Sequence, residues 1–227
     1  MQASAWESAF GAPGIGALGV RALGIGALGI VALGIGALPA EACPDGQAAA
    51  RAGVTVTFDD DTVVTYLLGE DGIVAETARF VGAGDPEGSG YGVLALHGLY
   101  VIEDFDLADG ERDAQTVERT EFPGGLDALP APEPGLRWSQ TVLVHQDGEP
   151  PFERRVALDV GAPRTLAVGA CSYESWPVTL RHDDALADDL MGLEFLPSLG
   201  IALFVSLADF GGAADRYVPL EIAPAAP

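Results

Sequence analysis

The residues best suited to nucleophilic catalysis lie together near position 180. His182 is followed by Asp183, and Ser172 and Ser175 precede them by a few positions. A hydroxyl nucleophile, an imidazole base and an orienting carboxylate are the parts of a hydrolytic triad. No G-x-S-x-G elbow, which presents the serine in many hydrolases, accompanies them. The pattern equally fits a histidine at a strand end beside a solvated acid, and we predict no catalytic residue.

Cysteine chemistry is confined to Cys43 and Cys171. A catalytic Cys171 with His182 as its base would need an electropositive surround to form the thiolate. Glu174 and Asp183 disfavour a thiolate at this place, because they add negative charge. We therefore predict a disulfide between Cys43 and Cys171, with an unpaired buried cysteine as the alternative. Disulfides form and persist in oxidising compartments.

Two acidic segments and three histidines are the candidates for metal binding. Residues 59–61 are three successive Asp, which suit a solvated hairpin turn. Residues 104–110 (DFDLADG) are similar to a calcium loop, but Ala occupies the third ligand position and no Glu stands at the twelfth. His97, His145 and His182 fall on different predicted strands, without the spacing of a zinc site. We predict neither a metal nor a cofactor site.

The charge of the chain is strongly negative, at −23, from 34 acidic residues against 11 basic ones. All 11 are Arg, and the sequence contains no Lys and no Asn. Schiff-base enzymes, pyridoxal-phosphate enzymes and P-loop proteins are excluded, because each needs a lysine amine. Nucleic acids and anionic membrane surfaces are excluded as partners, because both would be repelled. Arg154 and Arg155, the one adjacent basic pair, are predicted to form cross-strand ion pairs.

The first 42 residues have the pattern of an export signal. Residues 12–41 repeat every five positions, and residues 22–38 are uncharged and apolar. Arg21 precedes this run, and residues 40–42 (AEA) follow it with small residues at both positions that a signal peptidase reads. We predict a signal peptide over residues 1–42, cleavage before Cys43, and an exported domain over residues 43–227.

Alternatives to a cleaved signal remain open at this stage. They are an uncleaved membrane anchor, a lipoprotein signal and an elastin-like repeat. Glu7 and the lack of a basic residue before position 20 fit a signal badly, so we hypothesise that translation starts at Val20. The two G-x-G-x-x-G matches in residues 14–29 belong to this repeat and not to a strand–turn–helix unit, so we reject them as dinucleotide sites.

The rest of the chain alternates short β-branched and aromatic runs with turn residues. This pattern is typical of all-β proteins. The predicted strands are residues 54–58, 62–68, 73–80, 91–97, 99–105, 116–122, 136–145, 152–160, 164–168, 175–182, 193–196, 201–207 and 217–222, with 91–105 read as one bent strand kinked at Gly98. Only residues 46–51 and 183–191 look helical. The sequence predicts an all-β fold, a curved antiparallel sheet forming a half-barrel or open barrel, with few short helices.

Residues 123–135 (PGGLDALPAPEPG) contain four prolines and three glycines. Proline lacks the backbone donor that a ladder requires, so this stretch cannot continue a strand. We predict that it joins two β halves of the exported domain.

Three segments of the second half carry a resemblance to a known group. They are residues 165–173 (TLAVGACSY), 176–180 (WPVTL) and 194–200 (EFLPSLG). They resemble the V-x-x-G-x-(C/F) turn, the strand and the aromatic-x-Pro-x-Leu-Gly turn of uncharacterised bacterial periplasmic β-proteins. The fold of that group is similar to the half-barrel of the lipoprotein carriers LolA and LolB, a sheet curved around an apolar groove. The similarity covers about residues 136–210 and implies a fold but no catalytic residue.

These features together predict an exported, periplasmic or secreted β-protein whose mature domain does not span the membrane. We expect a non-catalytic binding or carrier module for an apolar small molecule or lipid, or for a segment of an envelope protein. The alternatives are a periplasmic hydrolase that uses scattered acids and His182, and a structural or assembly factor of the envelope. The oligomeric state is left open.

Overall fold

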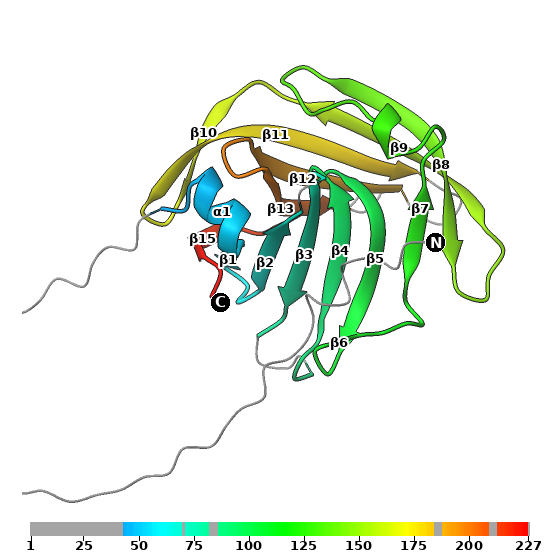
Figure 1. Ribbon diagram of the computed structural model, residues 1–227, viewed down its shortest axis with the longest axis horizontal. Coiled ribbons are helices and arrows are strands. Elements are labelled where there is room, and N and C mark those ends of the chain that lie inside the picture. Colours follow the sequence, from blue (N-terminus) through cyan, green and yellow to red (C-terminus); the bar gives the residue numbers. More distant parts are fainter. Residues whose placement is uncertain (1–42, 70, 82–85, 184–187, 209–212, 227) are drawn as a thin grey trace, which may run out of the picture. The chain divides into compact units, whose positions relative to one another are not determined.

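The structure is a computed structural model, which describes residues 43–69, 71–81, 86–183, 188–208 and 213–226 (Figure 1). These residues all belong to one compact unit. The predicted signal segment, residues 1–42, lies outside the described residues.

The described residues form one short α-helix, α1 (Gly46–Ala52), one 3₁₀ turn, η2 (Leu126–Ala128), and 15 strands in a single antiparallel sheet. The strands are β1 (Val54–Phe58), β2 (Val63–Leu68), β3 (Ile73–Arg79), β4 (Gly90–Leu96), β5 (Tyr100–Ala108), β6 (Glu111–Arg112), β7 (Glu118–Glu121), β8 (Arg137–Gln146), β9 (Phe152–Val160), β10 (Arg164–Val168), β11 (Cys171–Asp183), β12 (Asp188–Leu196), β13 (Ile201–Ala208), β14 (Asp215–Arg216) and β15 (Pro219–Pro224). The prediction of an all-β antiparallel fold is confirmed.

Neighbouring strands follow the order β14-β13-β12-β11-β9-β8-β7-β5-β4-β3-β2-β1-β15, while β10 pairs with β11 and β6 with β5. The sheet curves, so that strands from its two ends face each other (Figure 1). The described part of the sheet keeps β14 and β15 as edges and is not closed into a barrel.

Alternation of buried and exposed side chains explains why these segments are strands. In β1, Val54, Val56 and Phe58 are buried, whereas the two threonines between them are half-buried. A strand presents successive residues to opposite faces, so this pattern gives one face to the interior of the curved sheet.

The prediction of one bent strand across Gly98 is wrong. Strands β4 and β5 are antiparallel neighbours, with Leu96 opposite Tyr100. His97 has φ 55° and Gly98 has φ 68°. Two successive residues with positive φ make the tight turn whose twist suits a hairpin, so the chain reverses here instead of bending.

The predicted helix over residues 183–191 is also wrong. Strand β11 extends to Asp183 and β12 begins at Asp188, and the two residues are opposite each other in an antiparallel ladder. Residues 184–187 lie outside the described residues. Helix propensity is a weak preference, and pairing with a long neighbouring strand overrides it.

The proline-rich segment 123–135 lies between β7 and β8, which pair directly with each other. Hydrogen bonds hold this segment against the sheet, among them one from the Gly135 N–H to the Val160 carbonyl at 2.8 Å. The Tyr100 hydroxyl donates to the carbonyl of Pro130 at 2.9 Å, and Gln140 Nε2 donates to the carbonyl of Pro123 at 2.9 Å. The sheet therefore continues across the segment.

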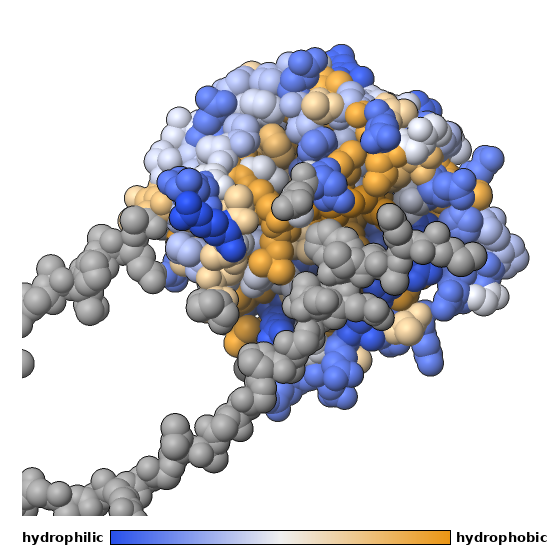
Figure 2. All heavy atoms as spheres, in the orientation of Figure 1, coloured by the Kyte–Doolittle hydropathy of each residue, from blue (hydrophilic) through white to orange (hydrophobic). Residues whose placement is uncertain are grey.

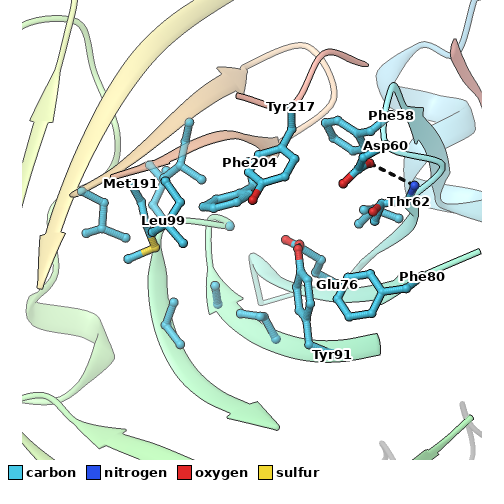
Figure 3. Close-up of a pocket in the computed structure, with 18 residues that line it drawn as sticks. Phe58, Asp60, Thr62, Glu76, Phe80, Tyr91, Leu99, Met191, Phe204 and Tyr217 are labelled. Carbon is cyan, nitrogen blue, oxygen red and sulfur yellow. Dashed lines mark hydrogen bonds between the residues drawn. The ribbon is translucent and has the colours of Figure 1, made fainter. Parts of the chain in front are cut away.

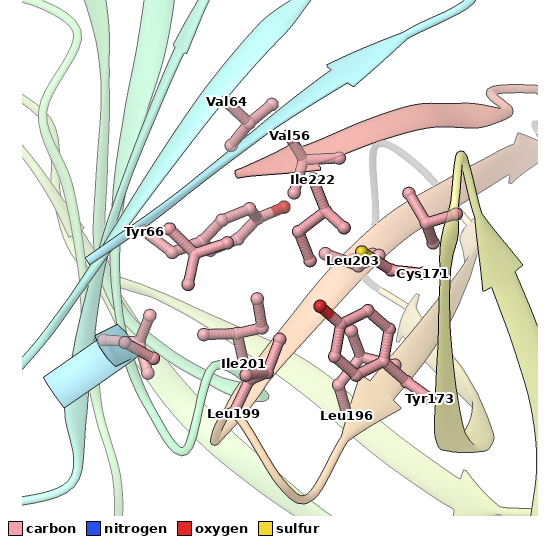
Figure 4. Packing of buried hydrophobic residues seen from close by; sticks show 14 of the residues in the cluster. Val56, Val64, Tyr66, Cys171, Tyr173, Leu196, Leu199, Ile201, Leu203 and Ile222 are labelled. Carbon is pink, nitrogen blue, oxygen red and sulfur yellow. The ribbon is translucent and has the colours of Figure 1, made fainter. Parts of the chain in front are cut away.

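One closed core, which we call the disulfide core, packs strands from the two ends of the sheet against each other (Figure 4). Its buried members are Ala49, Val54, Val56, Phe58, Val64, Tyr66, Val74, Ala78, Val168, Cys171, Tyr173, Leu196, Leu199, Ile201, Leu203 and Ile222. Cys43 bonds to Cys171, and the Tyr173 hydroxyl donates to the carbonyl of Pro44 at 3.1 Å. The start of the described chain is thereby fixed to the second half of the sheet.

A second core cluster lies further along the sheet, where β4 and β5 meet β8, β9, β11 and β12. It includes Leu99, Tyr100, Val142, Leu158 and Leu193 among its buried residues. Burial of these side chains and of the disulfide core supplies the main driving force for closing the sheet on itself.

Candidate functional site

A cavity of about 420 Å³ lies between the two walls of the curved sheet (Figure 3). One wall comes from β1 to β5 and the other from β11 to β13, with Tyr217 added before β15. The lining residues are Phe58, Asp60, Thr62, Val64, Glu76, Phe80, Tyr91, Val93, Ala95, Gly98, Leu99, Val101, Leu180, Met191, Leu193, Phe204, Leu207 and Tyr217. The volume is within the range of about 300–1,000 Å³ that is typical of small-molecule sites.

The lining is mainly apolar, and it includes members of both core clusters. Leu99 from the β4–β5 turn lies near Met191 of β12 and Phe204 of β13 (Figure 3). The rings of Phe204 and Tyr217 are 5.4 Å apart. On the face of the molecule drawn in Figure 2, hydrophobic residues are gathered in the middle and hydrophilic ones surround them. The cavity wall thus offers an apolar surface to a bound molecule.

Glu76 introduces a carboxyl group into this apolar lining. It lies on β3 in the same alternation phase as the buried residues Val74 and Ala78, and it is half-buried. Its cross-strand neighbours are Tyr66 on β2 and Val93 on β4. Strand alternation therefore directs Glu76 to the inner face of the sheet.

Tyr91 is the hydrogen-bond partner of Glu76. Its hydroxyl donates to Glu76 Oε1 at 3.0 Å, because Tyr91 is opposite Ala78 and therefore reaches Glu76 diagonally across the strands. Burial raises the pKa of Glu76 to about 7, and the hydrogen bond from Tyr91 partly opposes that increase. Burial also raises the pKa of both Tyr66 and Tyr91, and the nearby Glu76 charge adds to the effect. The carboxyl group changes charge near neutral pH.

The lining residues that are exposed are an acid and an aromatic ring, Asp60 and Phe80, and we place the mouth of the cavity at them. Asp60 is exposed in the β1–β2 turn, where its Oδ1 accepts a hydrogen bond from the backbone N–H of Thr62 at 3.0 Å. Phe80 is 38% exposed, and its ring lies 6.1 Å from that of Tyr91. A molecule entering past Phe80 meets Glu76 and Tyr91 on the same side (Figure 3).

The serine and histidine candidates for a triad are not brought together. Ser175 and His182 both lie on β11, seven residues apart, which places them about 23 Å from each other along the strand. Ser172 is farther still from His182. Ser175 is completely buried, so its hydroxyl is closed to a substrate. No nucleophile–base pair forms from these residues.

The acidic metal candidates occupy ordinary strand and turn positions. Asp59 Oδ1 accepts the backbone N–H of Val218 at 2.8 Å, which ties the β1–β2 turn to the chain before β15. Burial raises the pKa of Asp104 to about 6, and the adjacent Glu118 adds to the shift. Over the described ranges, no three His, Cys, Asp or Glu side chains are grouped so that they could hold a metal ion.

Arg154 forms an ion pair with Glu118, two strands away, which confirms the cross-strand prediction for this member of the adjacent pair. Arg155 donates to Ser139 Oγ at 3.3 Å. The three histidines lie apart, with His97 in the β4–β5 turn, and the Nε2 of His145 lies 3.1 Å from Glu121 Oε2. These contacts hold the sheet together rather than forming a site.

The predicted disulfide is confirmed. Cys43 and Cys171 are bonded, with their Cα atoms 5.6 Å apart and a sequence separation of 128. Such a bond is typical of an oxidising setting outside the cytoplasm.

Sequence reasoning missed Glu76 and Tyr91 as site residues. The available signal was the polar residue in the buried phase of β3, between Val74 and Ala78. Glu is rarely placed on a buried face without a partner or a function. Only the pairing of β3 with β2 and β4 shows that Glu76 faces the interior of the curved sheet.

Comparison with known proteins gives no relative for this chain: no family model, no curated protein and no solved structure matches it. Among the residues that the structure describes, no helix has the length and apolar character to cross a membrane.

Proposed function

We propose that this protein binds a lipid-like apolar molecule in the cavity between the two walls of its sheet, and that it does so without catalysis. The cavity of about 420 Å³ with its mainly apolar lining is the observation that carries this proposal. Each methylene group that such a wall removes from water contributes about 0.8 kcal/mol. A carrier or storage role follows from that chemistry, because apolar molecules need a protein to cross an aqueous compartment.

The setting that we propose is the periplasm or the cell exterior, reached through a signal peptide over residues 1–42. The bond between Cys43 and Cys171 supports an oxidising compartment. Cleavage before Cys43 leaves the cysteine at the start of the exported chain, next to the helix α1 that it helps to hold. Determination of the N-terminal residue of the exported protein tests the cleavage, and a chain that keeps the apolar run would contradict it.

A pair of variants on β4 tests the binding site. Val93 lines the cavity, whereas Leu94 is the next residue and lies on the opposite face of the strand. Val93→Trp fills the cavity, and Leu94→Trp adds the same ring outside it. With the neutral apolar dye N-phenylnaphthylamine, we expect saturable binding to the wild type, an affinity reduced about tenfold or more in Val93→Trp, and little change in Leu94→Trp.

Circular dichroism establishes that both variants are folded before the dye is added. Wild-type affinity in Val93→Trp would place the dye elsewhere and remove the support for this cavity. Solvent extraction of the purified protein followed by mass spectrometry then identifies the natural ligand. Turnover of model esters or glycosides with no bound lipid would instead favour the hydrolase alternative.

A further inference from the structure

The polar lining residues of the cavity are gathered at one end, while the other end is apolar. Asp60, Thr62 and Glu76 lie on one side in Figure 3, together with the rings of Phe58 and Phe80, and Leu99 and Met191 lie on the other. A bound molecule that matches both ends has a polar head and an apolar chain. The polar end is also the end at the mouth, where Asp60 is exposed.

The charge of the polar end has one sign. Of the 18 lining residues, Asp60 and Glu76 are acidic and none is basic. Tyr91 donates to Glu76 Oε1, and in the described part of the chain no residue donates to Oε2. An anionic head group would lie beside like charges here, whereas an ammonium group would gain a charge-assisted hydrogen bond. The chain as a whole carries a charge of −23, which also attracts cations.

We propose that the cavity takes a single-chain amphiphile with an amine head group, its ammonium at the Glu76 carboxylate and its alkyl chain beside Leu99, Met191 and Phe204. This inference rests on the proposed function, and it adds the chemical class of the ligand. A volume of about 420 Å³ is near the lower end of the range for small-molecule sites, which favours one chain over two.

The affinity for an amine head group should depend on pH. The titratable groups around Glu76 are Tyr66 on β2, Tyr91 on β4, and Asp60 and Tyr217 at the mouth, while β12 and β13 contribute only apolar side chains to the lining. Burial raises the pKa of Glu76 to about 7, so below that pH the carboxyl is neutral in the empty cavity. An ammonium ligand needs the carboxylate and therefore binds more tightly as the pH rises.

The test compares dodecylamine, dodecanol and dodecanoate by calorimetry, each below its micelle concentration or solubility limit, at about pH 5.5 and about pH 8.5. An alkylamine stays protonated at both values, as a lysine side chain does. We expect dodecylamine to bind about tenfold or more tightly at the higher pH and to be the best ligand there. Glu76→Gln keeps an acceptor for Tyr91 but removes the charge, so it should lose about tenfold or more in affinity at the higher pH, together with the pH dependence.

Glu221→Gln is the matched control, because Glu221 is exposed on β15 and does not line the cavity. It should bind dodecylamine as the wild type does. Equal or tighter binding of dodecanol or dodecanoate at the higher pH, or wild-type affinity in Glu76→Gln, would overturn the head-group inference and leave the binding function intact. Failure of all three ligands to bind the wild type would instead overturn the proposed function. The comparison of ligands on the wild type holds even if a variant fails to fold.

Discussion

The disulfide core and the cavity are built from the same strands but filled differently. At one end, side chains from β1 and β2 pack against those from β12, β13 and β15 in one cluster of buried residues. Further along, β1 to β5 face β11, β12 and β13 across about 420 Å³ of open volume, which Phe58 and Val64 of the disulfide core also border. Both regions are apolar, so the difference is one of packing rather than of hydrophobicity. A hydrophobic lining by itself therefore does not distinguish a core from a binding site.

Tyr66 and Tyr91 show the same difference between the disulfide core and the cavity. Tyr66 lies in the disulfide core with 1% of its surface exposed, and no residue in the described part of the chain bonds to its hydroxyl. Tyr91 lines the cavity, and its hydroxyl donates to Glu76. The tyrosine hydroxyl at the cavity therefore has a hydrogen-bond partner, whereas the tyrosine hydroxyl in the core has none among the described residues. Variants that change one region at a time test this contrast.

Removal of the disulfide should have the largest effect on the core. The bond closes a loop with a sequence separation of 128, and Cys43→Ser with Cys171→Ser should lower the free energy of unfolding by about 4–5 kcal/mol in the chain-entropy model. Urea unfolding of the double variant and of the oxidised wild type measures the difference. A loss below about 1 kcal/mol would show that the core is held by packing alone.

Leucine truncations on β13 compare the two regions directly. Leu203 is fully buried in the disulfide core, whereas Leu207 is half-buried and lines the cavity. Leu203→Ala should cost about 3 kcal/mol, because it leaves a new void in a filled core. Leu207→Ala enlarges a space that already exists and should cost about 1 kcal/mol. Equal losses in urea unfolding would mean that the cavity wall is packed as tightly as the core.

The pH dependence of stability should separate Glu76 from its glutamine variant. The pKa of Glu76 is about 7 in the folded chain against an ordinary value of 4.5, so the folded state holds the proton more tightly. The tighter proton binding at Glu76 stabilises the folded state fully below about pH 4.5, and this stabilisation is lost as the pH rises through about 7. Relative to Glu76→Gln, the wild type should therefore lose about 3 kcal/mol over this interval.

Urea unfolding of both proteins at several pH values measures that difference. Asp104, whose pKa is raised to about 6, titrates in both proteins and cancels in the comparison. A constant difference between the two proteins would mean that Glu76 titrates in the folded chain as it does in water.

The two tyrosines should respond to the same substitution with opposite signs. Tyr66→Phe removes a buried hydroxyl that has no partner and should raise the free energy of unfolding by up to about 1 kcal/mol. Tyr91→Phe removes the hydrogen bond to Glu76 and should lower it by about 1 kcal/mol. The same variant should raise the Glu76 pKa above about 7, because that hydrogen bond lowers the pKa. Carbon-detected NMR titration of the carboxyl measures this shift, and an unchanged value would contradict it.

Residue alternation and turn residues, which are local features of the sequence, are sufficient to predict most of the strands. Residues 152–160 and 164–168 were predicted with the bounds that β9 and β10 have, because β-branched runs end at turn residues on both sides. Local features were not sufficient at Gly98 and at residues 183–191, where the outcome depends on which strand lies beside the segment. The turn at His97 and Gly98 and the ladder between β11 and β12 both depend on which strand pairs with the segment. The sequence of a single segment does not contain that information.

The sequence by itself determined the strand-forming segments, the acidic surface and the only possible pairing of two cysteines, because alternation, charge and residue count are properties of the chain alone. Only the tertiary structure decided which apolar side chains fill a core and which border a cavity. Leu203 and Leu207 belong to one strand and one chemical type, yet the first meets Val56 and Ile222 in the same core and the second meets open space. The curvature of the sheet sets that difference, since it fixes how far apart the two walls lie.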